Sequence, residues 1–141
     1  MSAPAYFFAG ITMKLHLTGA QTGGQFCMVE SVMPPGYMTP PHVHANEDEG
    51  FLILEGELDV IVDGKRNRVR AGESLFAPRG VPHQLHNAGE RPVRAIGVST
   101  PSGFGDFVMA AGKPAGEGAP PPVDPAALVP VAARFGIRIP A

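Results

Sequence analysis

Three histidines and one glutamate in this sequence have the types and spacing of a metal site. His42 and His44 are two positions apart, so on a β-strand both imidazoles point to the same face. Glu49 follows five residues after His44, which leaves enough chain to cross to the next strand and point back. His83 comes much later, after residues 78–82 (PRGVP), a rigid turn that would fix how its strand enters.

Three neutral imidazole nitrogens and one carboxylate oxygen suit a borderline divalent transition metal, whereas Mg²⁺ and Ca²⁺ prefer all-oxygen ligands. An ion that accepts further ligands would keep open positions for water, O₂ or a chelating substrate. Taken alone, however, His42 and His44 also fit an exposed strand face, and Glu49 also fits a surface contact. The surroundings of these residues must therefore decide between the two readings.

The chain that would position these residues is rich in turns. Gly (18 residues) and Pro (16 residues) together make up about a quarter of the 141 residues, roughly double the usual share. Both residue types are unfavourable inside long helices. Residues 12–18 alternate between apolar and polar side chains, which is typical of a half-buried strand. The composition therefore predicts an all-β fold built from many short strands.

One hairpin can be predicted in register. Asp63-Gly64 lies between residues 58–62 and 65–70, and a two-residue Asp-Gly loop favours a type I′ turn. In this register Asp59 faces Arg68 and Glu57 faces Arg70. We interpret the basic run as a solvated sheet face neutralised by its partner strand, with a phosphate-binding stripe as the less favoured alternative.

Two short helices are predicted after residue 100. Ser102 can cap the first, whose apolar face ends before Gly112, and a Gly/Pro-rich linker follows at residues 113–122. Asp124 and a first-turn proline open the second helix, which Gly136 closes. Pro130 inside it predicts either a kink or a start later than Asp124. We expect both helices to pack on the sheet as caps.

The residues around the four candidate ligands resemble the two signatures of the cupin superfamily. The first is matched at every fixed position by Gly36, His42, His44, Glu49 and Gly56. The second is matched by Gly72, Pro78, Gly80, His83 and Asn87, and the 15 residues between the blocks match the shortest spacing in small microbial cupins. Residues 100–104 (TPSGF) further resemble the tail of small bacterial cupins related to quercetin dioxygenases.

This resemblance implies a fold, a site and a cofactor. It implies a double-stranded β-helix, or jelly-roll barrel, over residues 1–100, with motifs at 36–56 and 72–87, and a C-terminal extension over residues 101–141. It implies one divalent transition metal ion, Fe, Mn, Ni, Cu or Zn, held by His42, His44, Glu49 and His83. By the same match, Glu49 is also the candidate general base.

The function implied by the resemblance is an oxygenase acting on a small aromatic or enolisable substrate, with O₂ as the second substrate. Two alternatives stay open: a non-redox isomerase, cyclase or lyase, and a small-molecule binding module without catalysis. The resemblance also implies a homodimer, commonly formed by exchanged N-terminal strands. Residues 6–8 (YFF) suit this exchange and equally suit a strand on their own barrel.

Other residues are weaker candidates. His86 differs from His83 by an odd number and should point outward, and His16 should be an exposed strand residue. Glu47 or Asp48 would replace Glu49 as ligand only if a bulge shifted the strand, and Cys27 is expected in the core. Six apolar residues are expected to line a pocket above the metal or to fill the barrel: Met28, Met33, Met38, Phe51, Ile53 and Phe76.

Charge and composition argue against several classes of protein. The formal net charge is −2, which gives no electrostatic basis for binding nucleic acid. A single cysteine excludes an internal disulfide and fits a reducing compartment. No apolar run approaches the length of a membrane span, and the first residues lack the basic region of a signal peptide. We therefore expect a cytoplasmic protein with no membrane partner.

Overall fold

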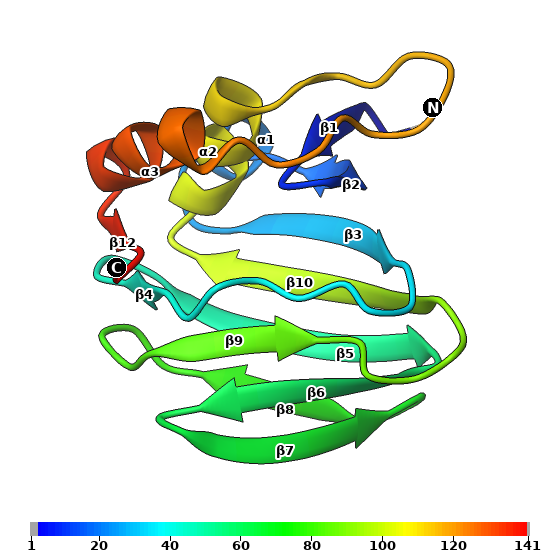
Figure 1. Cartoon of the computed structure of the whole chain (residues 1–141). Helices are drawn as coiled ribbons and strands as arrows, with labels where there is room; N and C mark the ends of the chain where they lie inside the picture. Colours follow the sequence, from blue (N-terminus) through cyan, green and yellow to red (C-terminus); the bar gives the residue numbers. More distant parts are fainter. Residues whose placement is uncertain (1–2, 141) are drawn as a thin grey trace.

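The computed structural model describes residues 3–140, in which short strands form facing sheets and helices cover one end (Figure 1). The strands are β1 (Ala5–Phe8), β2 (Ile11–Leu17), β3 (Cys27–Met33), β4 (Val43–His44), β5 (Asp48–Glu55), β6 (Glu57–Val62), β7 (Lys65–Arg70), β8 (Ser74–Ala77), β9 (His83–His86), β10 (Val93–Thr100), β11 (Lys113–Pro114) and β12 (Ile137–Arg138). The helices are α1 (Gly19–Thr22), α2 (Gly103–Ala111) and α3 (Pro125–Arg134). This is the predicted all-β jelly roll with short C-terminal helices.

The larger sheet has the order β11-β1-β2-β3-β10-β5-β8, and a smaller sheet has the order β7-β6-β9. A short pair, β12-β4, lies at one end. The core lies between the sheets and beneath the helices. As the alternating pattern predicts, Ile11, Met13 and Leu15 of β2 are buried, while Lys14 and His16 face solvent.

The β6–β7 hairpin has the predicted register, with Asp59 opposite Arg68 and Glu57 opposite Arg70. Asp63 and Gly64 both have positive φ angles, 51° and 78°, as a type I′ turn requires. The face of the hairpin is less uniformly solvated than expected. Asp59 is only 2% exposed, and its carboxylate accepts a hydrogen bond of 2.9 Å from Nε of Arg68. The basic run is therefore paired with its own hairpin partner, as interpreted from the sequence.

The C-terminal segment confirms some expectations and departs from others. Ser102 occupies the N-cap position of α2, but its side chain makes no capping hydrogen bond. Helix α3 begins directly after Asp124, whose Oδ1 accepts a hydrogen bond of 3.1 Å from Ala126 N, so the alternative of a later start is wrong. Pro130 has no N–H to donate to the carbonyl of Ala126. Helix α3 tolerates the missing hydrogen bond because both residues are exposed to water. The linker also begins with a strand, since β11 pairs with β1.

Two glycines of the motifs adopt a left-handed backbone conformation that favours glycine. Gly56 and Gly72, each at a strand junction, have φ angles of +83° and +86°. At Gly56 an added Cβ would also approach the carbonyl oxygen of Pro92 to 2.8 Å. Asn87 is fully buried and its side-chain amide donates to the carbonyls of Met33 and Arg91, which is a structural role. None of the described helices is both long and apolar enough to cross a membrane.

Candidate metal centre

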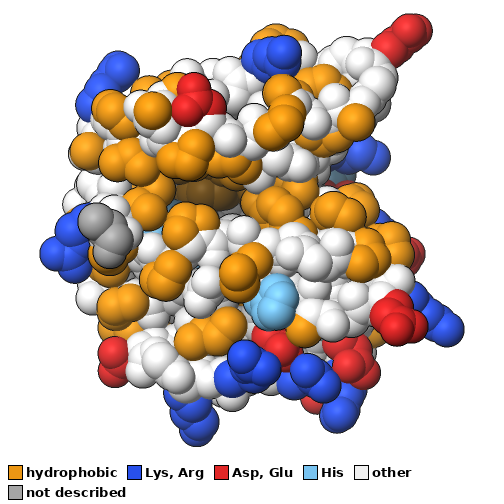
Figure 2. All heavy atoms as spheres, viewed as in Figure 1, with side chains coloured by type: hydrophobic (Ala, Val, Ile, Leu, Met, Phe, Trp, Pro, Cys, Tyr) orange, Lys and Arg blue, Asp and Glu red, His pale blue; other side chains and the backbone are white. Residues whose placement is uncertain are grey.

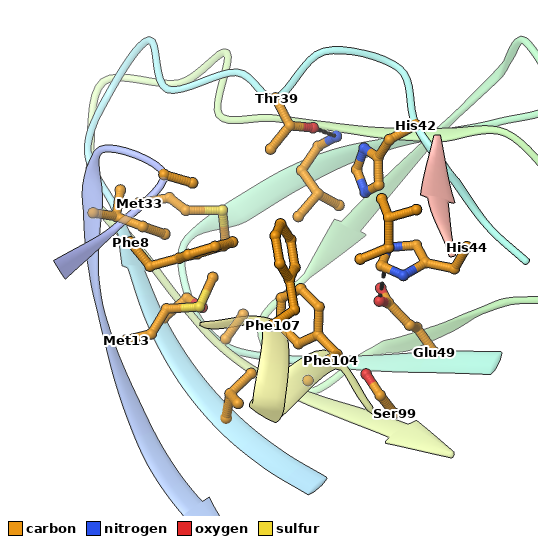
Figure 3. Close-up of a pocket in the computed structure, with 18 of the residues that line it drawn as sticks. Phe8, Met13, Met33, Thr39, His42, His44, Glu49, Ser99, Phe104 and Phe107 are labelled. Carbon is orange, nitrogen blue, oxygen red and sulfur yellow. Dashed lines mark hydrogen bonds and ion pairs between the residues drawn. The ribbon is translucent and has the colours of Figure 1, made fainter. Parts of the chain in front are cut away.

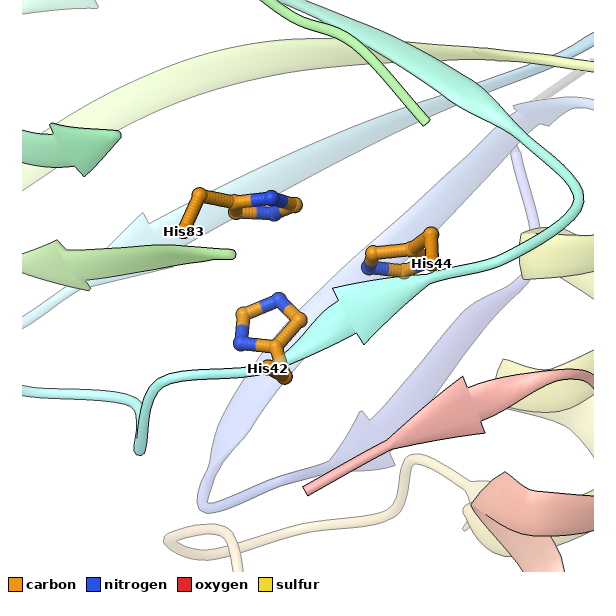
Figure 4. Close-up of side chains that lie close together, drawn as sticks. All are labelled: His42, His44 and His83. Atoms are coloured by element: carbon orange, nitrogen blue, oxygen red, sulfur yellow. The ribbon is translucent and has the colours of Figure 1, made fainter. Parts of the chain in front are cut away.

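His42 and His83 lie directly opposite each other in an antiparallel backbone pair. The N–H of each donates to the carbonyl of the other, and both hydrogen bonds are 2.9 Å. Because directly opposed residues project their side chains to the same face, the two imidazole rings come within 4.3 Å of each other, centroid to centroid. Backbone pairing thus joins the two motifs at the candidate site (Figure 4).

His44 is brought to the same place by contacts on both sides of β4. The N–H of Gly80 donates to the carbonyl of His44 at 2.8 Å, which ties the PRGVP turn to this strand. On the other side His44 pairs with Ile137 of β12. The His44 ring stacks on His83 with a centroid separation of 5.2 Å and an interplanar angle of 6°. His42, His44 and His83 each offer a ring nitrogen within 4.8 Å of the others (Figure 4).

Glu49, at the start of β5, completes the cluster from a neighbouring strand. Its Oε1 lies 3.0 Å from Nε2 of His44 (Figure 3). Its Oε2 lies 3.3 Å from Nε2 of His83. Burial works against its charge, yet His83 and His44 beside it hold the pKa of Glu49 below its ordinary value. The anion is therefore the stable form of this buried carboxyl group.

The cluster has more buried polar atoms than it can pair internally. Among the described residues, Oε1 of Glu49 and both ring nitrogens of His83 are buried without a hydrogen-bond partner. Their approaches to one another have ion-pair distances but lack hydrogen-bond geometry. Unpaired buried groups are costly and uncommon in folded proteins. A divalent cation between these nitrogen and oxygen donors would pair them, so the residues fit a metal ion.

The protonation state of His42 also suits ligation. Nδ1 of His42 lies 2.9 Å from the carbonyl of Pro40, which can only accept, so Nδ1 carries the proton and Nε2 is free. Burial, and then the neighbouring His83, lower the pKa of His42 to about 4, which keeps it neutral. For His44, burial opposes protonation, but the carboxylates of Glu47 and Glu49 raise its pKa.

Glu47 has a place that the sequence did not indicate. Its side chain is only 4% exposed and its Oε2 lies 3.4 Å from Nδ1 of His44, on the side of that ring away from Glu49. Sequence reasoning considered it only as a substitute for Glu49. Asp48 instead pairs with Arg79 at the surface, and His86 pairs with Asp59 across the β6–β9 ladder. No periodic pattern identifies Glu47, because it lies in the loop between β4 and β5.

A cavity of about 110 Å³ extends from the cluster into the barrel (Figure 3). Met33 and Phe51 line it as predicted, whereas Ile53 lies in the core. The predictions for Met28, Met38 and Phe76 are wrong, because none of them lines this cavity or packs in the core between the sheets. Met38 and Phe76 are 56% and 62% exposed. Phe76 pairs with Gly50 rather than Phe51, so strand alternation turns its side chain to the outer face.

The cavity walls are almost entirely apolar, and the C-terminal segment supplies one of them. Phe104 and Phe107 of α2, Leu128 of α3, and Ile137 and Ile139 line the cavity. The polar residues of the wall, apart from the cluster itself, are Ser31, Tyr37, Thr39 and Ser99. Among the described residues no lysine or arginine lines it. Figure 2 shows a hollow whose visible rim is largely hydrophobic.

Comparisons with known proteins agree with this geometry. The family model described as a cupin domain matches residues 29–99. Tetracenomycin polyketide synthase protein TcmJ of Streptomyces glaucescens is 32% identical over 95 residues, which are 67% of this chain and 63% of that protein. Quercetin 2,3-dioxygenase of Bacillus subtilis is 32% identical over 86 residues, which are 61% of this chain and 26% of that protein.

A solved structure shows the same fold. A predicted oxalate decarboxylase from Thermotoga maritima superposes with a TM-score of 0.64 at 23% identity, covering 70% of this chain and 92% of that one. At this identity the likeness concerns the fold alone. The chain spans less than two thirds of the length of either curated relative, 63% and 26%.

Proposed function

This chain belongs to the cupin domain family, and from that premise we propose that it is a metal-dependent oxygenase acting on a small aromatic or enolisable substrate. The observation that carries the proposal is the buried cluster of unpaired nitrogen and oxygen atoms at the end of an apolar cavity. We propose His42, His44, Glu49 and His83 as the ligands of one divalent ion, Fe, Mn, Ni, Cu or Zn. The ion would lower the pKa of a substrate hydroxyl and gather substrate and O₂.

Residues of the chain itself would accept a proton from the substrate and exclude water from the reacting atoms. Glu49 holds a buried carboxylate oxygen without a hydrogen-bond partner, and we propose that it accepts the proton of the substrate hydroxyl. Phe51 and Phe104 line the cavity with the cluster and would exclude water from the reacting atoms. The cavity volume of about 110 Å³ is of the same order as the roughly 150 Å³ of an engineered cavity that binds benzene, which supports a substrate body of about one ring.

The wall chemistry also restricts the charge of the substrate. With no lysine or arginine among the described lining residues, a carboxylate or phosphate carried deep into the cavity would lose its hydration without a counter-ion. A neutral ring that bears hydroxyl or keto oxygens avoids this cost, and Ser31, Thr39 and Ser99 offer it hydrogen bonds. The similarity to quercetin 2,3-dioxygenase supports oxygen chemistry on such a ring.

Two alternative functions have observations in their favour. The similarity to a polyketide synthase protein favours a non-redox isomerase, cyclase or lyase on an enolisable substrate, with the ion as Lewis acid. A binding module without catalysis is favoured because, among the described lining residues, only Tyr37 is titratable outside the cluster, and burial raises its pKa to about 12. We also propose a cytoplasmic homodimer, which light scattering of the purified protein would test.

The experiment begins with elemental analysis of protein purified without chelator, with a His83→Ala variant as the comparison. The protein is then loaded with each of the five metals and supplied with flavonols, catechols and β-diketones, with and without oxygen. The oxygenase proposal expects O₂ uptake that matches product formation. Full turnover with Zn²⁺ under anaerobic conditions would instead identify the non-redox enzyme. Ligand-induced thermal stabilisation without any product would identify the binding module.

A further inference from the structure

The three histidines of the cluster differ in what lies behind each ring. Nδ1 of His42 is held by a backbone carbonyl at 2.9 Å, and neither ring nitrogen of His83 has a hydrogen-bond partner. Only His44 has a carboxylate behind it, that of Glu47, which lies 3.4 Å from its Nδ1. Both side chains are nearly inaccessible, at 3% and 4% exposure, so water does not compete for this contact. The contact therefore connects a candidate ligand to a buried charge outside the ligand set.

Glu47 itself lies against the start of helix α2. An added Cβ on Gly103, the first residue of α2, would overlap Oε1 of Glu47, so the carboxylate lies directly against this helix end. The Ser102 side chain leaves the end of the helix without a side-chain cap, and the partial positive charge of a helix N-terminus favours an anion there. Phe104, the next residue of α2, also packs its ring 5.8 Å from that of His44.

We propose that Glu47 is a positioning residue for the metal centre and that α2 keeps it in place. The Glu47 carboxylate accepts the Nδ1–H of His44, which holds the ring in the tautomer that leaves Nε2 free for the ion. The proposal rests on the ligand set proposed above. It assigns to the C-terminal segment a function in the metal centre beyond that of a packed cap.

The first test uses the metal-free protein, so its outcome does not depend on any enzymatic activity. Long-range ¹H–¹⁵N NMR correlation above the ordinary imidazole pKa range distinguishes the two tautomers of each histidine. We expect His44 to carry its proton on Nδ1 in the wild-type protein and in Glu47→Gln, whose amide oxygen still accepts. In Glu47→Ala we expect this preference to be lost. The Nε2–H tautomer at His44 in the wild-type protein would overturn the proposal.

The second test is calorimetric titration of the same proteins with Zn²⁺ alone. We expect Glu47→Ala to bind Zn²⁺ about 10–100-fold more weakly, as for other second partners of ligating histidines, and Glu47→Gln to recover most of that loss. If Glu47→Gln loses Zn²⁺ as completely as Glu49→Gln, Glu47 is itself a ligand and the positioning role is wrong. Should Glu47→Ala fail to fold, the NMR and titration results for Glu47→Gln still decide between these outcomes.

A matched control exists on the surface of the sheet. His16 and Glu30 form a second histidine–glutamate contact, with 2.8 Å between Nε2 and Oε1, on β2 and β3 in an exposed setting. Glu30→Gln should change the signals of His16 and leave both the His44 tautomer and the Zn²⁺ affinity unchanged. Gly103→Ala should reproduce the loss seen in Glu47→Ala, because its Cβ displaces Glu47. A Gly103→Ala protein with wild-type Zn²⁺ affinity would refute the role of α2.

Discussion

The stability of a His83→Ala variant can show whether His83 is a metal ligand or an ordinary core residue. The side chain is about 1% exposed and neither ring nitrogen has a hydrogen-bond partner, although Nε2 lies 3.3 Å from Oε2 of Glu49. Two unpaired buried groups cost roughly 2–6 kcal/mol in the metal-free fold, at about 1–3 kcal/mol each. Truncation removes this cost and leaves a cavity that costs roughly 2–5 kcal/mol. The two terms nearly cancel.

We therefore expect metal-free His83→Ala to unfold in urea within about 2 kcal/mol of the metal-free wild-type protein. Leu58→Ala provides the comparison, because Leu58 is fully buried, belongs to the core cluster and has no polar atom to release. That variant bears the cavity cost alone and should lose about 2–5 kcal/mol.

Addition of metal should separate the two variants, because only His83→Ala removes a proposed ligand. A metal at a hundredfold excess over its dissociation constant stabilises the wild-type fold by about 2.7 kcal/mol, which raises Tm by roughly 5–10 °C for a chain of this size. His83→Ala should lose most of this shift, whereas Leu58→Ala should keep it. Equal destabilisation of both metal-free variants, together with no shift from any of the five metals in the wild-type protein, would refute the reasoning.

Three further changes test the fold and the cavity. Asp59→Asn should lower the free energy of unfolding by about 1–3 kcal/mol in urea, against less than about 1 kcal/mol for exposed Glu57→Gln. Arg68 holds the pKa of Asp59 below its ordinary value. The stability that the Asp59 carboxylate contributes is therefore complete above the ordinary carboxyl pKa and disappears as pH falls through the lower folded value. An Asp59→Asn loss that is the same at every pH would contradict this reasoning. Gly56→Ala should lower Tm more than Gly64→Ala. Both residues have positive φ, but only at Gly56 would the added Cβ also meet a carbonyl oxygen. Equal losses of Tm would argue against that contact. Ala95→Leu should fill the cavity and abolish the binding of ring-sized ligands in calorimetry without a large loss of Tm, and undiminished binding would place the ligand elsewhere.

The parts of the fold that local chemistry controls were predictable from the sequence. The Asp63-Gly64 turn set the hairpin register because both residues accept positive φ, and the alternation in β2 set its buried face. The spacing of His42 and His44 put both rings on one side, although β4 has only two residues. That strand holds its shape through pairing with His83 and with β12, which no local pattern contains.

The cavity was harder to predict because residue type does not reveal which face of a strand is inward. In β8 the residues Leu75, Phe76 and Ala77 are all apolar, so hydrophobicity alone gives no direction, and only the pairing with β5 turns Phe76 outward. Glu47 was misjudged for a related reason. Parity arguments apply on regular strands, whereas Glu47 lies in a loop, where its direction depends on the distant contact with Gly103.

The proposed ligands and much of the cavity wall come from different parts of the chain. Residues 36–56 and 72–87 supply the proposed ligands and the turns that aim them, so their pattern carries information about the ion. The wall that faces those ligands includes residues from α2, α3 and β12, which lie outside both motifs. Changes in the cavity-lining side chains of α2 and α3 would alter the shape of the cavity without replacing a proposed ligand. The same segment also reaches the metal centre, because Gly103 lies against Glu47 and β12 pairs with His44. Recognition of the motifs therefore predicts a metal site, whereas the substrate must be inferred from the C-terminal segment and the strands opposite it.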